Sequence, residues 1–378
     1  MRPNVNERLA VARCVICVGP GGVGKTSTSA AVAIEAARRG RRTLVLTIDP
    51  AKRLANALGL PEIGNEERLI DPSAFTRQGL AAPTAPLSAM MLDIKRTWDE
   101  VVTRHHPDPE RRQRLLENPL YVAMSTALAG SQEYMAMEKL HELSSRTHDP
   151  LDLIVLDTPP ANHAVDFLEA PNKIIDALDN DATRWLLEPY HQKKRLTKKL
   201  FDAGSSFFIR TISRFTGTEL LTDLGELLAG FQGMFDGFRA RAEAVRKLLA
   251  ADTTDFWVLS TPLQADEAQD FWARLSERDL LVAAVVLNRA TPDPYDGTGP
   301  ADPAALAAAI QAAGGGPELT ERLLYVTQQM ATQAGAERAR AEALRAAVSG
   351  TPVILVPQRP EDVHDLVGLE ALRQGLFG

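Results

Sequence analysis

The stretch CVICVGPGGVGKT, which runs from Cys14 to Thr26, decides the fold. Its first five residues form a short apolar, β-branched run, and residues 19–26 match the pattern G-x-x-x-x-G-K-[ST]. The alanine-rich segment that follows, as far as Arg39, is typical of a helix. A glycine loop between a strand and a helix lets backbone N–H groups close around phosphate oxygens at the positive end of the helix. The sequence therefore predicts a phosphate-binding loop.

The expected ligand of this loop is ATP with Mg²⁺. Lys25 is predicted to reach the β and γ phosphates and to act in catalysis. The hydroxyl of Thr26 is predicted to ligate Mg²⁺, a hard cation that favours oxygen ligands. The nucleotide-binding residues expected from the motif are Gly21, Gly22, Val23, Gly24, Lys25, Thr26 and Ser27.

Short apolar runs alternate with helical segments along the chain, which predicts an α/β fold with a mostly parallel sheet flanked by helices. The runs are CVICV, TLVLTID, AMMLDI, LDLIVLD, FWVLS, VAAVVLN and VILVP. Residues 95–148 and 165–250 break this rhythm with apolar residues at helical spacing, and they are expected to form an inserted α-helical subdomain. Residues 1–94, 149–164 and 251–378 would then form the nucleotide-binding core.

The composition is that of an ordinary globular chain. It has 378 residues, 45% of them apolar and 24% charged, and a net charge of −7. This acidity argues against DNA as a partner, since binding a phosphate backbone needs a positive face. No run approaches the roughly 20 apolar residues that span a bilayer, and the N-terminal apolar stretch is too short for a secretory signal. These features predict a cytoplasmic protein without an integral membrane segment.

Two aspartates close predicted strands. Asp157 ends LDLIVLD at the carboxyl edge of the sheet, where open α/β sheets bind their ligands. It is predicted to hold Mg²⁺, and the alternative is a carboxylate that caps the next turn. Asp49 closes TLVLTID and is predicted to orient the water that attacks the γ-phosphate.

Several motifs together resemble one known family. GPGGVGKTS, TIDPAKRLANALGL and DTPPANHAVDFL are similar to the P-loop, switch I and switch II of the ArsA family, which contains arsenite-pump and tail-anchored-protein-targeting ATPases. LAGSQEYMAMEKL, VVLNR and VPQRPEDVHDLVGL resemble three later motifs of that family, in the same order. The resemblance covers most of the chain.

The resemblance implies a P-loop NTPase of the deviant Walker A (SIMIBI) class that works as a homodimer. Mg-dependent ATP hydrolysis would then be coupled to the helical subdomain, with Asp49 positioning the water and Asp157 serving magnesium. Asn288 would contact adenine, and Pro357 and Gln358 would flank it.

The sequence departs from the family pattern in the loop. The family usually has a lysine at the second loop position, which reaches the partner's phosphates, and here that position is Pro20. Proline supplies neither a charge nor an N–H. Lys52 or Arg53 is the candidate replacement, and the alternative is that both are solvated cations at the start of a helix.

The positions of the cysteines bear on the cargo and on the dimer. Arsenite prefers sulfur ligands, and neither helical insertion contains cysteine, so an arsenite site is not expected. Cys14 and Cys17 belong to a strand, and we expect them to pack and not to bind metal. The chain also lacks the later C-x-x-C motif with which targeting ATPases clip their dimers through zinc.

The apolar stretch from Phe207 to Phe235 could form a groove for a hydrophobic peptide or membrane-protein cargo, but helix core is the favoured interpretation. The alternatives to an efficient ATPase are a targeting or chaperone module with little hydrolysis and a partition-type ATPase.

Overall fold

The structure is a computed structural model, and it describes residues 4–48, 53–127, 131–159, 161–179, 223, 226–227, 230–231, 234–295 and 302–378. The chain forms two compact units. One comprises residues 1–90, 151–164 and 250–378, and the other comprises residues 91–150 and 165–249.

The first unit is built on an eight-stranded sheet with the order β3-β4-β2-β5-β1-β6-β7-β8. β5, β1, β6, β7 and β8 run parallel to their neighbours, as does β2 to β5, whereas β3 and β4 are antiparallel. The bounds are β1 (Cys14–Val18), β2 (Thr43–Thr47), β3 (Arg68–Leu69), β4 (Leu87–Met91), β5 (Leu153–Asp157), β6 (Thr254–Ser260), β7 (Val282–Ala290) and β8 (Val353–Pro357). The predicted α/β fold with a mostly parallel sheet is confirmed.

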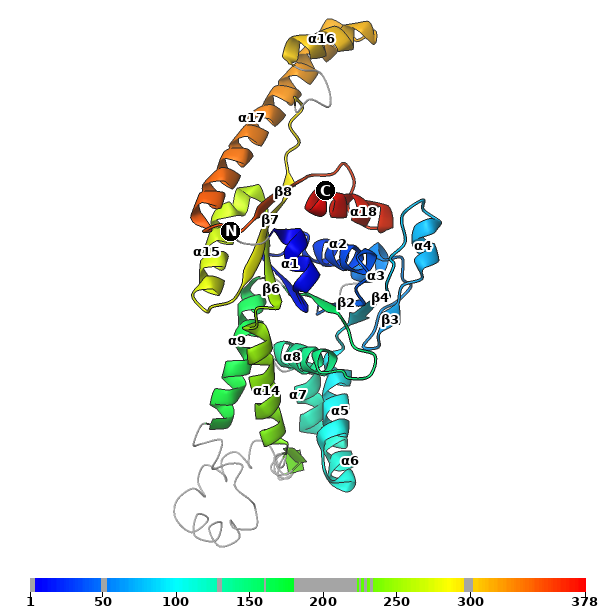
Figure 1. The fold of residues 1–378 in the computed structure, drawn as a ribbon, viewed down its shortest axis with the longest axis vertical. Coiled ribbons are helices and arrows are strands. Elements are labelled where there is room, and N and C mark those ends of the chain that lie inside the picture. The colour runs from blue at the N-terminus through cyan, green and yellow to red at the C-terminus, as the bar shows by residue number, and fades with distance from the viewer. Residues whose placement is uncertain are drawn as a thin grey trace, which may run out of the picture. The chain divides into compact units, whose positions relative to one another are not determined.

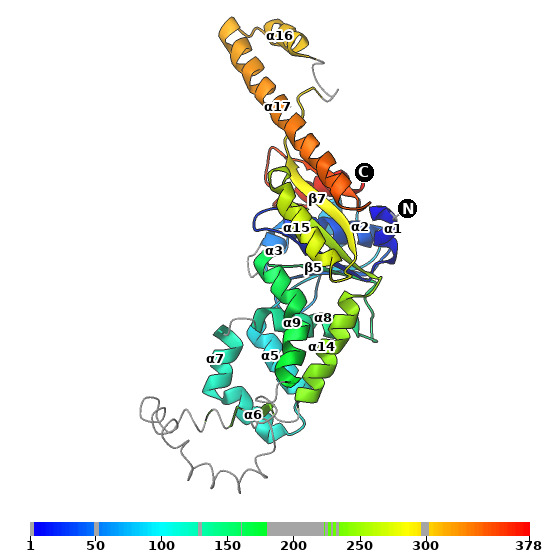
Figure 2. The same ribbon diagram turned by 90° about the vertical axis from the view of Figure 1, so that its left-hand side faces the viewer.

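Helices cover both faces of this sheet, and Figure 1 shows α2 and α15 on opposite sides of it. The helices of the unit are α1 (Val5–Val11), α2 (Lys25–Arg38), α3 (Arg53–Ala57), α4 (Pro72–Thr76), α15 (Ala265–Ser276), α16 (Pro303–Ala312), α17 (Pro317–Ala347) and α18 (Leu366–Phe377). α2 packs against β5 and α18, and α15 packs against β6, β7 and α17. Figure 2 shows α15 in front of the strands from the second direction.

Coverage on both faces explains why the central strands are continuous apolar runs. Every residue of β1, β2, β5 and β6 is buried. Burial also raises the pKa of Cys14 and of Cys17 to about 12, so both thiols are neutral packing groups at physiological pH. Trp257 of β6 packs against Phe377 of α18, with ring centroids 5.9 Å apart.

The second unit is helical. Its helices are α5 (Ile94–His105), α6 (Pro109–Glu117), α7 (Pro119–Ala127), α8 (Ser131–Ser144), most of α9 (Ala161–Asp179) and α14 (Phe235–Leu249). Trp98 lies at the centre of an aromatic core, 5.4 Å from Tyr134 and 6.1 Å from Phe231 between ring centroids. Phe231 and Met234 are buried, while the apolar residues from Phe207 to Leu221 lie outside the described residues.

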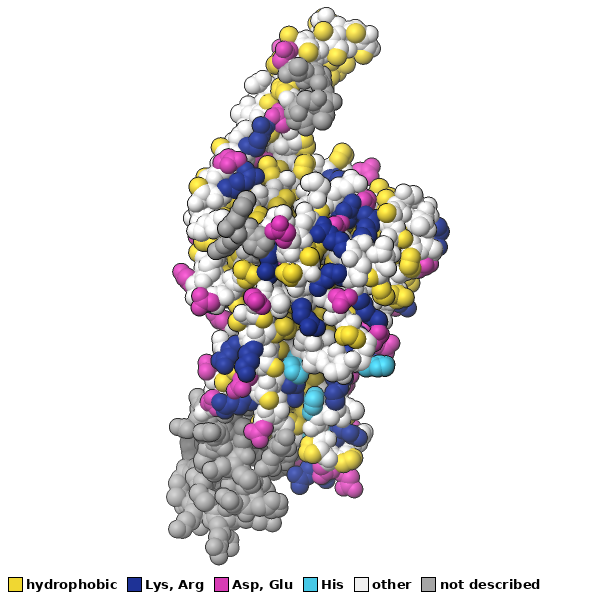
Figure 3. All heavy atoms as spheres, in the orientation of Figure 1, with side chains coloured by type: hydrophobic (Ala, Val, Ile, Leu, Met, Phe, Trp, Pro, Cys, Tyr) yellow, Lys and Arg dark blue, Asp and Glu magenta, His cyan; other side chains and the backbone are white. Residues whose placement is uncertain are grey.

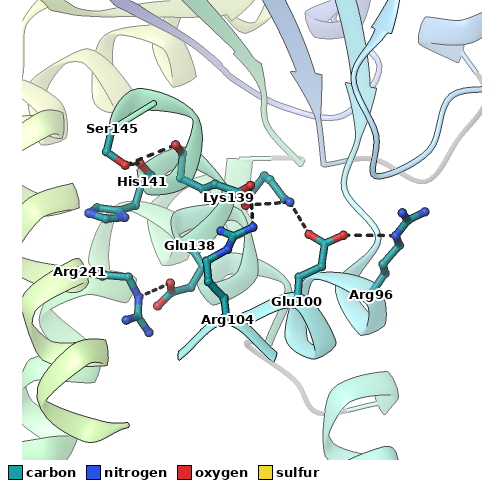
Figure 4. A network of polar contacts seen from close by, with 9 residues as sticks. Arg96, Glu100, Arg104, Glu138, Lys139, His141, Ser145 and Arg241 are labelled. Carbon is teal, nitrogen blue, oxygen red and sulfur yellow. Dashed lines mark hydrogen bonds and ion pairs between the residues drawn. The ribbon is translucent and has the colours of Figure 1, made fainter. Parts of the chain in front are cut away.

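Polar contacts also link α8 to α5 and to α14 (Figure 4). Lys139, whose side chain is only 3% exposed, donates to Glu100 at 2.7 Å and to Glu142 at 3.0 Å. Arg241 Nε donates to Glu138 at 2.5 Å. Within the described parts of the chain, no helix combines the length and the apolar character that crossing a bilayer requires.

Candidate nucleotide-binding site

The glycine loop lies between the end of β1 and the start of α2, as the motif predicts. A Cβ added to Gly19 would lie 2.1 Å from the carbonyl oxygen of Leu259, so the loop approaches β6 more closely than any side chain allows. Gly24 has a φ of +93°, and a Cβ there would lie 2.4 Å from Nδ2 of Asn288. Glycine at these two positions therefore brings the loop against both β6 and β7.

Lys25 is held across the loop. Its side chain is largely buried, and Nζ donates to the carbonyl oxygens of Gly19 at 3.0 Å and of Pro20 at 2.8 Å. The ammonium group therefore lies against the start of the loop, while Lys25 itself is the first residue of α2. This places a positive charge beside backbone N–H donors, which together form an anion-binding arrangement.

Asp157 receives hydrogen bonds from two hydroxyl groups. Its Oδ2 accepts from Thr26 Oγ1 at 2.7 Å and from Thr47 Oγ1 at 2.9 Å. The parallel register of β2 and β5 sets Thr47 beside Asp157, which explains the second contact. A hydroxyl and a carboxylate in contact fit Mg²⁺, which binds few protein oxygens and takes its other ligands from phosphate and water.

A cavity of about 810 Å³ opens in front of the loop. Nine of the predicted nucleotide-binding residues line it: Gly21, Gly22, Gly24, Lys25, Thr26, Ser27, Asn288, Pro357 and Gln358. Val23 is buried and Asp157 lies behind Thr26, so neither is part of the wall. Asp49 and Lys52 lie outside the described residues, whereas Arg53 lines the cavity.

Asn288 connects β7 to the loop. Its Nδ2 donates to the carbonyl oxygen of Val23 at 2.9 Å, and its Oδ1 accepts from the backbone N–H of Arg289 at 3.0 Å. The side chain is therefore fixed at the boundary between the glycine loop and the end of β7.

The chain matches the family model of the anion-transporting ATPases, ArsA, over residues 12–298. The chain belongs to this family. The resemblance expected from the sequence is thereby confirmed, and the family is one of ATPases.

The individual relatives share less than a third of their aligned residues with this chain. ATPase get3 of Aspergillus terreus is 31% identical over 170 residues, which cover 44% of this chain and 45% of the relative. An uncharacterized protein of Streptomyces coelicolor is 28% identical over 285 residues, 74% of this chain and 63% of the relative. ATPase GET3 of Malassezia globosa is 29% identical over 164 residues, 43% and 44% of the two chains. The chain thus spans less than two thirds of the length of each.

In this ArsA-family chain, the cavity also contains residues that the sequence did not single out individually. They are Asn56, Thr158, Arg289, Arg359, Glu361, Asp362, Val363, His364 and Leu372. The motif VPQRPEDVHDLVGL indicated the segment that contains residues 357–364 but not which side chains face the ligand. In the motif VVLNR, the sequence indicated a binding role for Asn288 but none for Arg289, which follows it.

Proposed function

We propose that the protein is a Mg-dependent ATPase that binds the triphosphate of ATP at the Gly21–Ser27 loop. The observation that carries this proposal is the cavity that the loop, Lys25 and Thr26 line together, with Asp157 hydrogen-bonded to Thr26 behind the wall. Family membership supports hydrolysis as the outcome of binding. Asn288, Pro357 and Gln358, farther along the same cavity, are the proposed contacts of the base.

The residues of the chain divide the work of phosphoryl transfer. Backbone N–H groups of the loop and Lys25 would hold the negative charge of the phosphates. They would also stabilise the charge that develops on the phosphate oxygens in the transition state. Thr26 and Asp157 would hold Mg²⁺, which, when bound, would neutralise charge on the phosphate oxygens. Thr47 keeps the Asp157 carboxylate oriented through its 2.9 Å hydrogen bond. Asp49 is the proposed residue that aligns the attacking water.

We further propose a homodimer in the cytoplasm, in which nucleotide state is transmitted to the helical unit. Hydrophobic or membrane-protein cargo stays the candidate ligand of that unit. The burial of Phe231 and Met234 counts against these two as part of an open groove. Arsenite is not proposed, because the helical insertions contain no cysteine.

A partition-type ATPase is the weaker alternative. The described part of the face in Figure 3 carries both Lys and Arg and Asp and Glu side chains. Together with the net charge of −7, this mixture does not favour a nucleic-acid partner.

Calorimetric titration of ATP tests the proposal. The wild-type chain is expected to bind ATP with Mg²⁺ and to lose most of that affinity with a chelator. Lys25→Ala should weaken binding by roughly 10- to 100-fold, since a charged hydrogen bond contributes about 1.5–3 kcal/mol. Thr26→Ala should bind ATP with similar affinity in the presence and absence of Mg²⁺. Thr26→Ser keeps the hydroxyl group, so its affinity should still depend on Mg²⁺.

The matched control is Lys247→Ala, which removes an exposed lysine from α14 and should bind ATP like the wild type. Phosphate release measured on the same variants reports hydrolysis. A folded wild-type chain without Mg-dependent affinity for ATP would overturn the proposal.

A further inference from the structure

β7 is irregular at the edge of the cavity. Its register with β8 shifts between Leu287 and Ala290. Within this shift, Arg289 adopts a φ of +60°. Strand irregularities of this kind occur beside active sites, where they re-aim a side chain.

The backbone of Arg289 is unusual for its residue type. The other described non-glycine residues with positive φ are Asp149, Asp279 and Ser349, whose short polar side chains suit turns. Arginine has no such local compensation, and a left-handed conformation is unfavourable for it. An unfavourable backbone conformation inside a strand indicates that the position of the side chain has a use.

The irregularity sends consecutive side chains to different places. Asn288 is buried against the glycine loop, whereas Arg289 is exposed and lines the cavity. Among the residues that the structure describes, none forms a hydrogen bond or ion pair with the guanidinium of Arg289. The group is therefore available to a ligand.

The surroundings of Arg289 indicate which part of a nucleotide it would meet. On one side, Asn288 contacts the loop through Val23. On the other side, the N–H of Gln358 donates to the carbonyl oxygen of Ala290 at 2.7 Å, which joins the ends of β7 and β8. Arg289 thus lies between the phosphate loop and the far wall, to which Pro357, Gln358, Val363 and Leu372 contribute.

We propose that Arg289 stacks its planar guanidinium on the base of the bound nucleotide. This inference rests on the proposed function, because the loop fixes the phosphates and the nucleoside must extend into the rest of the cavity. Pro357, Val363 and Leu372 in that part of the wall suit a flat heteroaromatic ring, beside the charged residues 359, 361 and 362. Guanidinium groups stack well on such rings. Arg289 would then contribute affinity for the base and little for the phosphates.

Titration of three ligands tests the assignment: ATP, ADP and inorganic tripolyphosphate, each with Mg²⁺. Arg289→Ala is expected to weaken ATP and ADP by about 10-fold and to leave tripolyphosphate unchanged, because stacking acts only on the base. Arg289→Lys keeps the charge without the plane, so it should lose most of the same affinity. Arg274→Ala, on an exposed arginine of α15, is the matched control and should bind all three ligands normally.

Arg289→Gly separates the binding role from a structural one. Glycine adopts positive φ without strain, so this variant should melt at a temperature equal to or above that of the wild type while losing the same nucleotide affinity. Equal losses for ATP and tripolyphosphate would overturn the assignment to the base. So would unchanged affinity in Arg289→Gly, or wild-type affinity in Arg289→Lys. A wild-type chain that binds none of the three ligands would instead contradict the proposed function.

Discussion

At the scale of single residues, Gly24 is a loop position where an added side chain would meet another residue of the site, Asn288. Its φ of +93° disfavours any side chain, and a Cβ would collide with Nδ2 of Asn288. Gly24→Ala should therefore displace Asn288 from its bond to Val23 as well as strain the backbone. We expect a loss of roughly 2–4 kcal/mol in the free energy of unfolding, the sum of backbone strain and a broken buried hydrogen bond.

Gly79→Ala is the matched control for this prediction. Gly79 also has positive φ, at +72°, but an added Cβ there meets nothing within 4 Å. Chemical denaturation of both variants isolates the contact with Asn288 as the difference between them. Equal losses of stability would show that this contact does not matter.

The sequence predicted the residues of the loop because the motif itself encodes their geometry: glycines, lysine and threonine at fixed spacing between a strand and a helix. Six of the loop residues and three predicted residues from later in the chain, Asn288, Pro357 and Gln358, line one cavity. Arg289 could not be predicted in the same way. The sign of its φ depends on how β7 pairs with β8, and no local pattern in VVLNRA records that pairing.

At the scale of secondary-structure elements, a buried ion pair joins α8 to α14. The side chains of Glu138 and Arg241 are 3% and 9% exposed, and Tyr134 also donates to Glu138. Arg241→Met should leave the carboxylate buried without its cation and should cost about 3–5 kcal/mol of unfolding free energy. Urea denaturation measures the loss.

The same helix offers a control and a rescue. Arg239 forms exposed ion pairs with Asp179 and Glu243, so Arg239→Met should have little effect on stability. Combining Arg241→Met with Glu138→Met should recover most of the lost stability, because neither charge is then buried alone. A double variant as unstable as the single one would contradict this account.

His141 of α8 makes the helical unit sensitive to acid. Burial lowers the pKa of its imidazole, and the charge of Arg241 adds to the effect, whereas Glu138 and Glu142 oppose it. The unfolded chain, with a histidine pKa near its ordinary value of 6.5, therefore takes up a proton before the folded protein does. This group thus lowers stability as the pH falls through about 6.5 toward its lower folded value.

His141→Gln should flatten that dependence when urea midpoints are compared at about pH 7 and pH 5. His148→Gln, at an exposed position just beyond α8, is the matched control. An unchanged pH dependence in His141→Gln would exclude His141 as the source.

The elements themselves were predictable to different degrees. Strands buried on both faces give continuous apolar runs, so β1, β2, β4, β5, β6 and β7 were predicted. The partly exposed edge strand β8 was also predicted, because its run VILVP is equally apolar. β3 was not, since Arg68 and Leu69 are both exposed and two residues carry no periodicity. The order of strands in the sheet also escapes the sequence, because it depends on contacts between segments far apart in the chain.

At the scale of the whole molecule, the strand order explains why the site forms where it does. β5 lies between β1 and β2, so the end of β5 carries Asp157 to the loop that follows β1 and to Thr47 at the end of β2. β6 and β7 continue the sheet on the other side of β1 and supply Leu259 and Asn288. Together with Pro357 at the end of β8, one edge of the sheet thus gathers residues from six strands.

If the protein is a homodimer as proposed, its molecular mass in solution should depend on bound nucleotide. With Mg²⁺ and a non-hydrolysable ATP analogue, sedimentation equilibrium should give twice the 41.1 kDa of one chain. Lys25→Ala should stay monomeric under the same conditions if phosphate binding drives association. A wild-type mass that is the same with and without nucleotide would contradict nucleotide-driven dimerisation.

Within such a dimer, the charge missing at Pro20 must come from another cation if transition-state stabilisation is to match that of lysine-containing loops. Arg53 is placed for this role, because it lines the cavity at the start of α3, and no described residue forms an ion pair with it.

Replacing Lys52 and Arg53 together by alanine should lower the turnover of bound ATP by about 10-fold or more. The affinity for ATP measured by calorimetry should fall less, since the two cations are expected to act on the transition state. Restoring a lysine through Pro20→Lys in that background should recover part of the rate. Single-turnover hydrolysis at saturating ATP decides the matter: an unchanged rate in the double variant would mean that Lys52 and Arg53 are solvated cations and that the loop works with Lys25 alone.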